Sequence, residues 1–388
     1  MPLESLELFA GAGGLALGFS AQGVEHRAIV EWNAHACETI RNNRRLGVAA
    51  VAGWPEVTEG DVRAFDYAPH AGADLVTGGP PCQPFSMGGK HGGFLDVRDM
   101  FPEAIRAVRE ARPRAFVFEN VKGLTRAAFV NYFSYIQLQL EFPSLLPKAR
   151  EPWLDHLARL ERHKTKGGAS EYTLLVRLVN AANYGVPQKR LRVFIVGFRA
   201  DVHEEWSFPE ATHGEEALLW RQWRTGEYWD AHRVARKDRP SAPAGIERKL
   251  AAIEDADSLA LAPWLTVRDA IAGLPDPERF PGKGRHQAHK FQPGARIYPG
   301  HTGSPLDEPA KALKAGDHGV PGGENMLRRP DGSVRYFTIR ESARIQTFPD
   351  EYVFDGSWTE VMRQLGNAVP VRLAATVAGS VCGLLAAR

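Results

Sequence analysis

One cysteine stands in a loop that prolines and glycines stiffen. The loop runs Gly78-Gly79-Pro80-Pro81-Cys82-Gln83-Pro84-Phe85-Ser86 and follows an apolar run, residues 74–77, that has the pattern of a strand. A free cysteine is usually a small buried hydrophobe. A thiol in a loop at the carboxyl edge of an open α/β sheet lies instead where ligands bind. Because Cys37 and Cys382 fall in expected helices, Cys82 is the candidate nucleophile.

A carboxyl group and two guanidinium groups accompany later strand-like runs. Glu119 ends one run, where it can face the same cleft as Cys82; a low local dielectric would raise its pKa and let it donate a proton to a ring nitrogen. Arg190 and Arg192 alternate at the start of the next run, so both are expected on one face. Facing the thiol, they can hold a carbonyl oxygen and phosphates. On a solvated edge they would have no such role.

A glycine-rich turn near the N-terminus indicates a nucleotide or nucleoside ligand. Gly11 and Gly13 open a G-x-G-x-x-A pattern between a strand-like run and a helix start, which is also the dinucleotide pattern of nicotinamide enzymes. Glu31 follows about 20 residues later, where an acid commonly accepts ribose hydroxyls. Trp32 can stack on an adenine or be a core aromatic, and Asp61 can accept from an adenine amino group or be a turn residue. Together they favour a nucleoside-containing cofactor.

The elements that must position these groups alternate along the first half of the chain. Short apolar runs are predicted as strands at residues 6–9, 26–31, 73–77, 115–119 and 193–197, with helices at 15–22, 34–42, 100–112 and 174–182. This alternation predicts an α/β fold with a doubly wound, parallel sheet covered by helices.

The remainder of the 388 residues changes character. Residues 126–172 resemble an insertion with an amphipathic helix at 153–164. From 201 to 335 Pro, Gly, His and Trp become frequent and the alternation stops, which predicts a second, smaller, irregular domain. Residues 336–388 return to helical periodicity and end in an apolar helix, which is expected to pack back on the first domain.

Composition excludes several classes. Hydrophobic residues make up 44% and charged residues 24%, so disorder and fibrous repeats are excluded. We find no uncharged apolar run of about 18 residues and no signal peptide, so no membrane span is predicted and a cytoplasmic protein is expected. Three distant cysteines form neither a disulfide framework nor a metal motif, and scattered histidines predict no metal site. Net charge is only +2, but residues 279–335 hold ten Lys or Arg against five acids, as a DNA-facing surface would.

Taken together, these residues resemble the bacterial DNA (cytosine-5)-methyltransferases of restriction-modification systems. Nine blocks occur in the family's order, covering most of the chain: 9–14, Glu31-Trp32, 60–62, 80–83, 96–98, 119–121, the Gln188-x-Arg190-x-Arg192 pattern, 340–349 and 364–370. One departure is Ala312, which stands where family members often have a threonine before Leu313. That departure puts a local backbone contact to DNA in doubt.

The resemblance implies roles for particular residues. Cys82 would be the nucleophile, Glu119 would engage N3 and the amino group of the target cytosine, and Arg192 would bind its O2 with Arg190 alongside. The S-adenosylmethionine pocket would be lined by Phe9, Gly11, Gly13, Leu15, Glu31, Trp32, Asp61, Val62, Pro80 and Asn367. Residues 1–200 would form the catalytic domain, 201–335 the target-recognition domain, and 336–388 a segment that packs back on the catalytic domain.

The implied reaction is methyl transfer from S-adenosylmethionine to C5 of a flipped cytosine in double-stranded DNA, without a metal. The resemblance also implies a monomer, with a cognate restriction endonuclease as a possible partner. Three alternatives stay open: a nicotinamide-dependent oxidoreductase that uses the same glycine turn, a DNA-binding protein on an inactive methyltransferase scaffold, and the same chemistry on RNA. The first leaves Cys82, Glu119 and residues 364–370 without roles. The intact Cys82, Glu119 and Arg192 argue against the second, and the long second domain favours duplex DNA over RNA only by analogy.

Overall fold

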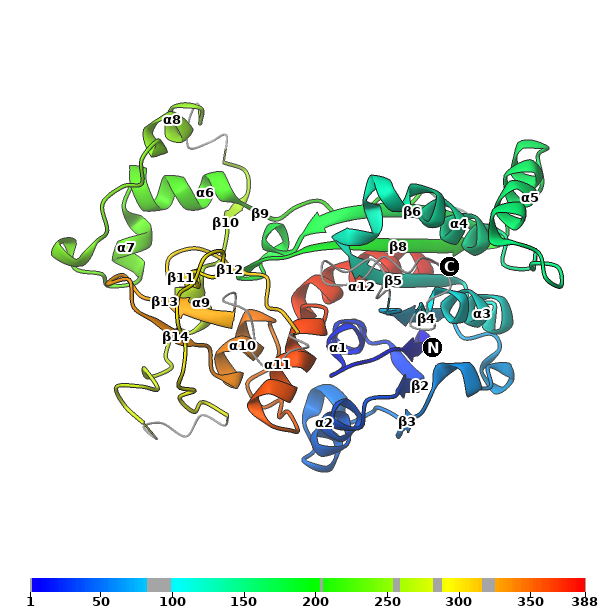
Figure 1. Ribbon diagram of the computed structural model, residues 1–388, viewed down its shortest axis with the longest axis horizontal. Helices are drawn as coiled ribbons and strands as arrows, with labels where there is room; N and C mark the ends of the chain where they lie inside the picture. Colours follow the sequence, from blue (N-terminus) through cyan, green and yellow to red (C-terminus); the bar gives the residue numbers. More distant parts are fainter. Residues whose placement is uncertain are drawn as a thin grey trace. The chain divides into compact units, whose positions relative to one another are not determined.

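The chain forms two compact units. The computed structural model describes residues 2–81, 99–202, 205–253, 259–281, 288–315 and 325–387 (Figure 1). The first unit comprises residues 1–179, 191–209 and 374–388, and the second comprises 180–190 and 210–373. Residues 336–373 thus share a unit with the predicted target-recognition region, whereas the whole segment 336–388 was expected to pack back on the catalytic domain. Cys82 lies outside the described residues.

A seven-stranded sheet organises the first unit. Its order is β3 (Val57–Glu59), β2 (Glu25–Glu31), β1 (Glu4–Leu8), β4 (Leu75–Gly78), β5 (Ala115–Val121), β8 (Leu191–Arg199) and β6 (Tyr172–Asn180). The order turns back between β1 and β4, as in a doubly wound Rossmann-like sheet, so the predicted α/β fold class is confirmed. The first five strands are parallel, but β8 runs antiparallel to β5. The expectation of a wholly parallel sheet is therefore wrong at β8.

The predicted helix at 174–182 is the other error in this half. These residues belong to the edge strand β6, which continues into a short 3-10 turn, Ala181–Tyr184. Short apolar runs are ambiguous between the two periodicities, and Tyr172, Thr173, Val176 and Val179 are β-formers. Pairing beside β8 satisfies the backbone groups that a helix would have satisfied internally. The five predicted strands are all present.

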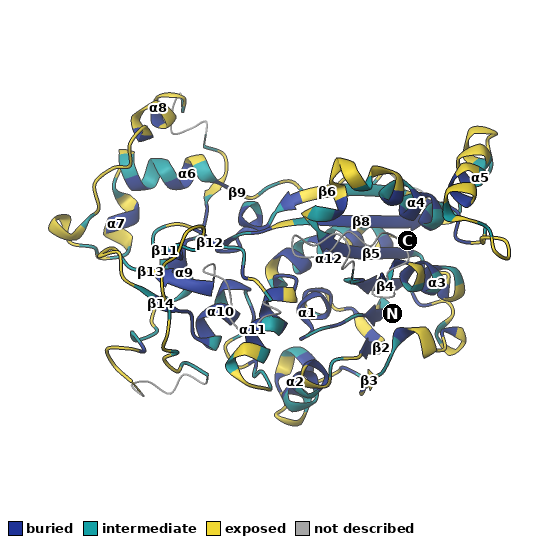
Figure 2. Ribbon diagram, viewed as in Figure 1, coloured by how far each residue is buried: buried dark blue, intermediate teal, exposed yellow. Residues whose placement is uncertain are grey.

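Helices pack against the sheet. They are α1 (Gly14–Ser20), α2 (Ala34–Arg45), α3 (Phe101–Ala111), α4 (Val130–Glu141) and, at the C-terminus, α12 (Val371–Ala386). A further helix, α5 (Trp153–Thr165), packs against α4. Figure 2 shows the central strands in the buried colour and much of α5 exposed. A Cβ placed on Gly18 would lie 2.3 Å from Cβ of Ala374, so α1 and α12 pack closely only because residue 18 is glycine. Trp206 also donates to Oγ of Ser380 at 2.9 Å, so α12 packs on the first unit.

The C-terminal stretch Trp358–Ala386 is long and apolar enough, by length and composition, to cross a membrane. Pro370 separates it into two helices, α11 (Trp358–Asn367) and α12. Of its most apolar window, 56% is buried inside the protein, as expected for helices that pack in a core.

One carboxyl group is buried completely inside the sheet. Glu7 on β1 is 1% exposed, and Oγ1 of Thr77 on the adjacent strand β4 donates to it. Desolvation raises the pKa of Glu7 from 4.5 to about 8, against the lowering effect of that hydrogen bond. Folding therefore favours the protonated form.

The pH dependence of stability should reveal this group. A raised native pKa contributes stability below pH 4.5 that is lost as the pH rises to about 8, at about 1.4 kcal/mol per pH unit. The Glu7→Gln variant should show a flatter decline and a higher unfolding free energy than wild type at pH 8, measured by urea denaturation from pH 5 to 8. Glu25→Gln, on the exposed start of β2, should keep the wild-type decline. Equal slopes for Glu7→Gln and wild type would contradict the assignment.

The second unit combines short strands and helices. In chain order they are β7 (Gln188–Lys189), β9 (His213–Gly214), α6 (Glu215–Leu219), a π-helical turn (Trp220–Arg224), α7 (Glu227–Ala231), α8 (Ile246–Ala251), β10 (Ala262–Pro263), α9 (Val267–Ala270), β11 (Ser304–Pro305), β12 (Ala310–Lys311), β13 (Met326–Arg328), β14 (Val334–Tyr336), α10 (Ile339–Ile345) and α11. The short elements agree with the irregular character expected from the sequence.

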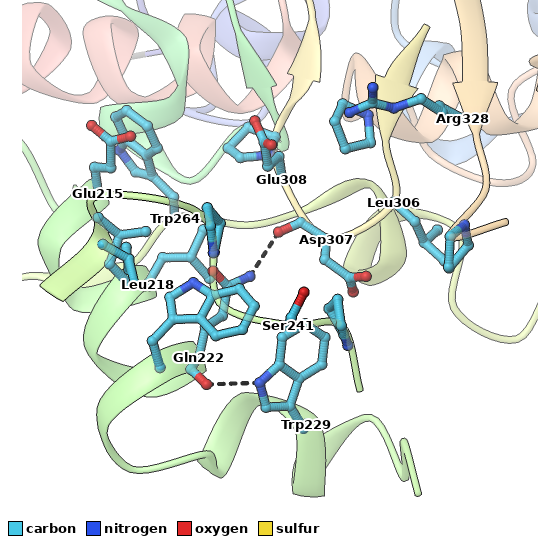
Figure 3. Close-up of a pocket in the computed structure, with 18 of the residues that line it drawn as sticks. Glu215, Leu218, Gln222, Trp229, Ser241, Trp264, Leu306, Asp307, Glu308 and Arg328 are labelled. Carbon is cyan, nitrogen blue, oxygen red and sulfur yellow. Dashed lines mark hydrogen bonds between the residues drawn. The ribbon is translucent and has the colours of Figure 1, made fainter. Parts of the chain in front are cut away.

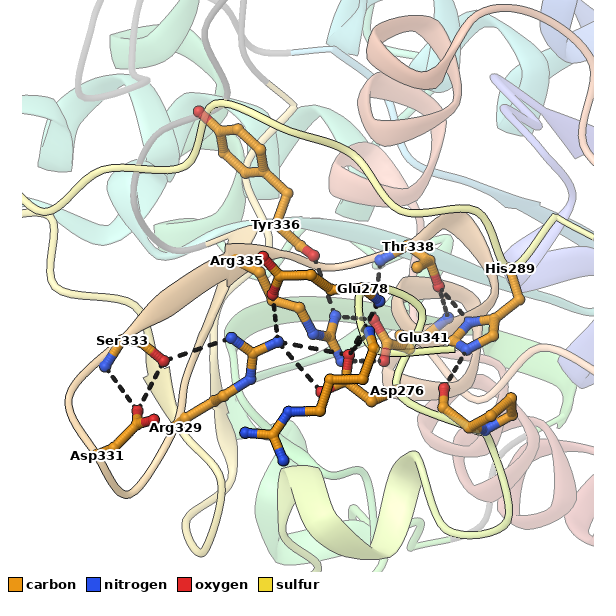
Figure 4. Close-up of polar contacts among 12 residues, drawn as sticks. Asp276, Glu278, His289, Arg329, Asp331, Ser333, Arg335, Tyr336, Thr338 and Glu341 are labelled. Carbon is orange, nitrogen blue, oxygen red and sulfur yellow. Dashed lines mark hydrogen bonds and ion pairs between the residues drawn. The ribbon is translucent and has the colours of Figure 1, made fainter. Parts of the chain in front are cut away.

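Part of the basic segment of this unit is used internally. Arg335, 3% exposed, pairs with Glu341 of α10 at 2.6 Å, and Arg329 pairs with Asp276 at 3.1 Å (Figure 4). Glu341 also completes a capping box with Thr338. Arg335 therefore adds nothing to a basic surface that faces DNA, because its charge is buried and compensated within the fold.

Candidate active site

The predicted site residues of the first unit gather at the carboxyl edge of the parallel strands. Leu8, which ends β1, is in register with Gly78, which ends β4, and Gly78 is in register with Phe118 of β5. Because parallel strands end on the same side, the turn after β1, the segment after Gly78 and Glu119 lie next to one another. Ligands of open α/β sheets bind at this edge.

The glycine turn after β1 is held open by a buried acid. Phe9, Gly11 and Gly13 all have positive φ, at 55°, 54° and 82°. Glu31, at the end of β2, accepts from the backbone N–H groups of Gly11 at 2.7 Å and Trp32 at 2.9 Å. A Cβ on Gly11 would meet no atom within 4 Å, so open space borders the backbone there. A ligand can therefore approach this turn closely.

The neighbouring candidates differ in exposure. Trp32 is 70% exposed, so its interpretation as a core aromatic is wrong and its ring is available to a ligand. Asp61 caps the short helix that follows β3 and pairs with Arg63, whose side-chain hydrogen bond lowers the pKa of Asp61. Asp61 therefore lies in a turn, and its carboxyl group is partly exposed. Val62 and Leu15 are 5% and 3% exposed and belong to the packing beneath the turn.

Glu119 and Arg192 form the charged centre of this edge. Nε of Arg192 lies 2.5 Å from Oε1 of Glu119, and both side chains are about nine-tenths buried. Desolvation lowers the pKa of Arg192, while the charge and hydrogen bond of Glu119 act to raise it. Glu119 is thus buried, as a low local dielectric requires, and a guanidinium group compensates its charge there.

The antiparallel direction of β8 makes this pair possible. Val121, at the carboxyl end of β5, is in register with Arg192, near the start of β8. In a parallel sheet the start of a strand lies at the opposite edge, so Arg192 would have been remote from Glu119. The proximity of the two groups could be predicted from the sequence, whereas the strand direction that brings them together could not.

The segment that precedes Cys82 is fixed beside Glu119. A Cβ on Gly79 would lie 3.5 Å from Oε2 of Glu119. Asn120 donates through Nδ2 to the carbonyl oxygen of Pro80 at 2.8 Å, a positioning contact that the sequence analysis missed. Pro81 accepts from the backbone N–H of Met100 at 3.0 Å. The residues on both sides of the segment 82–98 are therefore anchored at this edge.

The other two thiols are poor nucleophiles. Cys37 lies in α2 and Cys382 in α12, as predicted, and both are buried. Desolvation is the main cause that raises the pKa of Cys37 to about 12 and that of Cys382 to about 11.

Arg190 and Asn367 belong to the second unit. Arg190 is 1% exposed, and its guanidinium donates to the backbone carbonyl oxygens of Leu313, Gly366 and Ala368 at 2.9, 2.5 and 3.1 Å. The expectation that it stands ready for phosphates or a carbonyl oxygen, on the same face as Arg192, is therefore wrong. Asn367 is exposed at the end of α11.

A cavity of about 620 Å³ lies within the second unit (Figure 3). Trp229 and Trp264 contribute to its wall, and their indole N–H groups donate to Gln222 O and Asn183 Oδ1. These indole N–H groups are thus engaged within the fold, so the two rings offer a ligand apolar surface rather than free donors. We assign this cavity no part in the reaction. Among the described residues no group of three or more His, Cys, Asp or Glu is arranged to hold a metal ion.

Comparison with known proteins identifies relatives over nearly the whole chain. The family model described as C-5 cytosine-specific DNA methylase matches residues 3–142, 158–240 and 283–382. The type II methyltransferase M.NgoMIV of Neisseria gonorrhoeae is 33% identical over 97% of this chain and 96% of its own length. The type II methyltransferase M.Eco47II of Escherichia coli is 32% identical over 98% of this chain and 79% of its own length. The crystal structure of the S. pombe Dnmt2 methyltransferase shares the fold, with a TM-score of 0.56 at 17% identity over 99% of both chains.

Proposed function

Because the chain belongs to the C-5 cytosine-specific DNA methylase family and is a DNA (cytosine-5)-methyltransferase, we propose how it performs the transfer. A methyl group passes from S-adenosylmethionine to C5 of a cytosine that is flipped out of a specific duplex sequence. A covalent bond between Cys82 and C6 of that cytosine activates the base. The observation that carries this proposal is the buried Glu119–Arg192 pair beside the segment that leads into Cys82.

The pair matches the polar edge of a cytosine. Cytosine C5 is a poor nucleophile until a thiolate adds at C6, which turns the ring into an enamine. Glu119 engages N3 and the exocyclic amino group, and a hydrogen bond or proton at N3 takes up the electron density that addition brings. Arg192 binds O2 and holds the Glu119 carboxyl group in place. Extrusion of the base from the stack costs a few kcal/mol, which contacts of the second unit with DNA must offset.

Three steps complete the reaction after the thiolate has added to C6. C5 takes the methyl group, the proton at C5 leaves to a base, and expulsion of the Cys82 thiolate restores the aromatic ring. A buried thiol such as Cys37 would be a poor nucleophile and a poor leaving group, because burial disfavours its thiolate. Cys82, which follows Pro80 and Pro81 in the sequence, is the remaining thiol.

The carboxyl edge fits S-adenosylmethionine, which supplies an electrophilic sulfonium methyl group when bound. Open space borders the backbone of Gly11 in this turn, and Glu31, which fixes the turn, takes the position where an acid commonly accepts ribose hydroxyls. Trp32 offers an exposed ring on which an adenine can stack. Asp61 and Val62 follow β3, and the carbonyl oxygen of Pro80 accepts from Asn120. The resemblance adds Asn367 to this set.

The proposal extends to partners. Double-stranded DNA is the substrate, and residues 201–335 read its sequence. The enzyme acts in the cytoplasm as a monomer and uses no metal. A restriction endonuclease of the same specificity accompanies it. Exposed cations such as Lys290, Arg296 and Arg328 are available to phosphates.

Methyl transfer is tested directly. Purified enzyme should incorporate tritiated methyl groups from S-adenosylmethionine into duplex DNA and not into duplex RNA of the same sequence. Bisulfite sequencing of plasmid from expressing cells should then show protected cytosines at a single recurring sequence. Incorporation should fall steeply with salt, because phosphate contacts release counterions. Transfer to RNA alone, or fully converted plasmid DNA together with no incorporation, would refute the proposal.

A further inference from the structure

Two exposed cations follow β5, the strand that ends at the carboxyl edge. They are Lys122 and Arg126, and residues 120–140 contain no aspartate or glutamate. Most of the described arginines of the first unit form ion pairs with carboxylates, as Arg41 does with Glu59 at 2.7 Å. Among the residues that the structure describes, neither Lys122 nor Arg126 has such a partner. Both charges are therefore available to an anion.

A buried leucine fixes the turn that carries these two cations. The 3-10 turn Lys122–Thr125 begins directly after β5, and Leu124 within it is fully buried in the core of the first unit. Oγ1 of Thr125 donates to the carbonyl oxygen of Lys122 at 3.0 Å and closes the turn. The backbone is thus held in place, while the two cationic side chains stay exposed on either side of the leucine.

The same turn lies beside the Glu119–Arg192 pair. Val121, the last residue of β5, is in register with Arg192 of β8, and the turn that follows Val121 contacts β8. Lys122 comes three residues after Glu119, so their Cα atoms are at most about 11 Å apart. All of these residues belong to the first unit. A ligand group next to a base bound at Glu119 is therefore within reach of the turn.

We propose that Lys122 and Arg126 bind the backbone phosphates that flank the flipped cytosine. The inference rests on the proposed function, which brings the base of that cytosine to Glu119. The base and the phosphates of one nucleotide are separated only by its sugar, so these phosphates must come close to the carboxyl edge. The ammonium group of Lys122 is a compact charge on a flexible stem, and the Arg126 guanidinium can bind two phosphate oxygens at once. Such contacts position a DNA strand without reading its sequence.

The salt dependence of DNA binding tests these contacts. The probe is a short duplex that carries the sequence identified by bisulfite sequencing. Each lost phosphate contact should reduce the slope of the logarithm of the association constant against the logarithm of salt concentration by about 0.9. The double variant Lys122→Gln/Arg126→Gln should therefore have a slope about 1.8 smaller than wild type and bind about 10- to 60-fold more weakly at 0.1 M salt. In steady-state kinetics most of the loss should appear in the KM for DNA rather than in the turnover number.

Arg162 and Lys166 offer a matched control in the same unit. Both are exposed, and neither has an ion-pair partner among the described residues. The chain that follows them enters β6 at the edge opposite Glu119, because Tyr172 donates to the carbonyl oxygen of Pro113, just before β5, at 2.9 Å. Arg162→Gln/Lys166→Gln removes the same net charge. Since charges more than about 10 Å apart are largely screened at 0.1 M salt, it should keep the wild-type slope.

A charge-preserving variant separates phosphate binding from a structural role. Lys122→Arg/Arg126→Lys keeps both charges and should retain most of the wild-type slope. Calorimetric binding of S-adenosylmethionine should be unchanged in all three double variants, which shows that the first unit is folded. A wild-type slope in Lys122→Gln/Arg126→Gln, or an equal loss in Arg162→Gln/Lys166→Gln, would overturn the inference. A wild-type enzyme that neither methylates nor binds duplex DNA would refute the proposed function, and the inference with it.

Discussion

Cys82→Ser is expected to lose more than about 1,000-fold in methyl transfer while it binds S-adenosylmethionine as wild type does. A serine hydroxyl is far less ionised than a thiol at neutral pH and is a much weaker nucleophile towards C6. The change removes one sulfur atom and adds no bulk. Transfer is measured with tritiated S-adenosylmethionine and duplex DNA, and cofactor binding by calorimetry.

The other cysteines provide matched controls. Cys382→Ala removes a thiol that is 7% exposed and whose pKa burial raises to about 11, so transfer should change by less than about threefold. Duplex DNA with 5-fluorocytosine at the target should form an adduct that survives denaturation with wild type and with Cys382→Ala, because fluorine cannot leave as the C5 proton does. The adduct should be absent with Cys82→Ser. Near wild-type turnover by Cys82→Ser would exclude covalent catalysis by this residue.

Glu119→Gln is expected to lower the turnover number by about 100- to 10,000-fold. The amide keeps the shape of the side chain and can still accept from Arg192, but it carries neither the proton nor the charge that N3 requires. Because cofactor binding involves other residues of the edge, the dissociation constant for S-adenosylmethionine should stay within about twofold. Single-turnover kinetics at saturating DNA isolate the chemical step.

A second buried Arg–carboxylate pair provides a control that distinguishes a loss of catalysis from a loss of stability. Glu341 pairs with Arg335 at 2.6 Å in the second unit and is 1% exposed. Both Glu341→Gln and Glu119→Gln weaken a buried ion pair, so both should reduce the unfolding free energy, whereas only Glu119→Gln should reduce turnover of the folded enzyme. Comparable losses of turnover in the two variants would show that Glu119 acts through stability alone.

The main elements could be predicted from the sequence because their signals are local. Apolar runs followed by glycines mark β1 and β4, and the amphipathic periodicity of α3 and α5 follows from residue spacing. The prediction of a helix at residues 174–182 was wrong because nine residues of mixed β-branched and aliphatic character fit the period of a helix as well as that of a strand. Partnership with β8 decided the outcome, and that partnership is not local.

The exposure of the side chains at the site and their hydrogen-bond partners were less predictable from the sequence. Trp32 gave no signal that distinguishes a stacking ring from a core ring, and Arg190 had the same alternation as Arg192. The structure separates them: Trp32 is 70% exposed, and the buried Arg190 guanidinium donates to three backbone carbonyl groups. Contacts of this kind join residues more than a hundred positions apart, so no spacing rule can reveal them.

The amino-acid sequence by itself determined the family, the α/β class and the chemical groups at the carboxyl edge, because these depend on residue identity and local pattern. The direction of β8 was decided only by the tertiary structure. Running antiparallel, β8 places Arg192 at its start against Glu119 at the end of β5. The reason is physical: strand direction depends on which partner completes the hydrogen bonds of a sheet, and a strand carries the same alternating pattern in either direction.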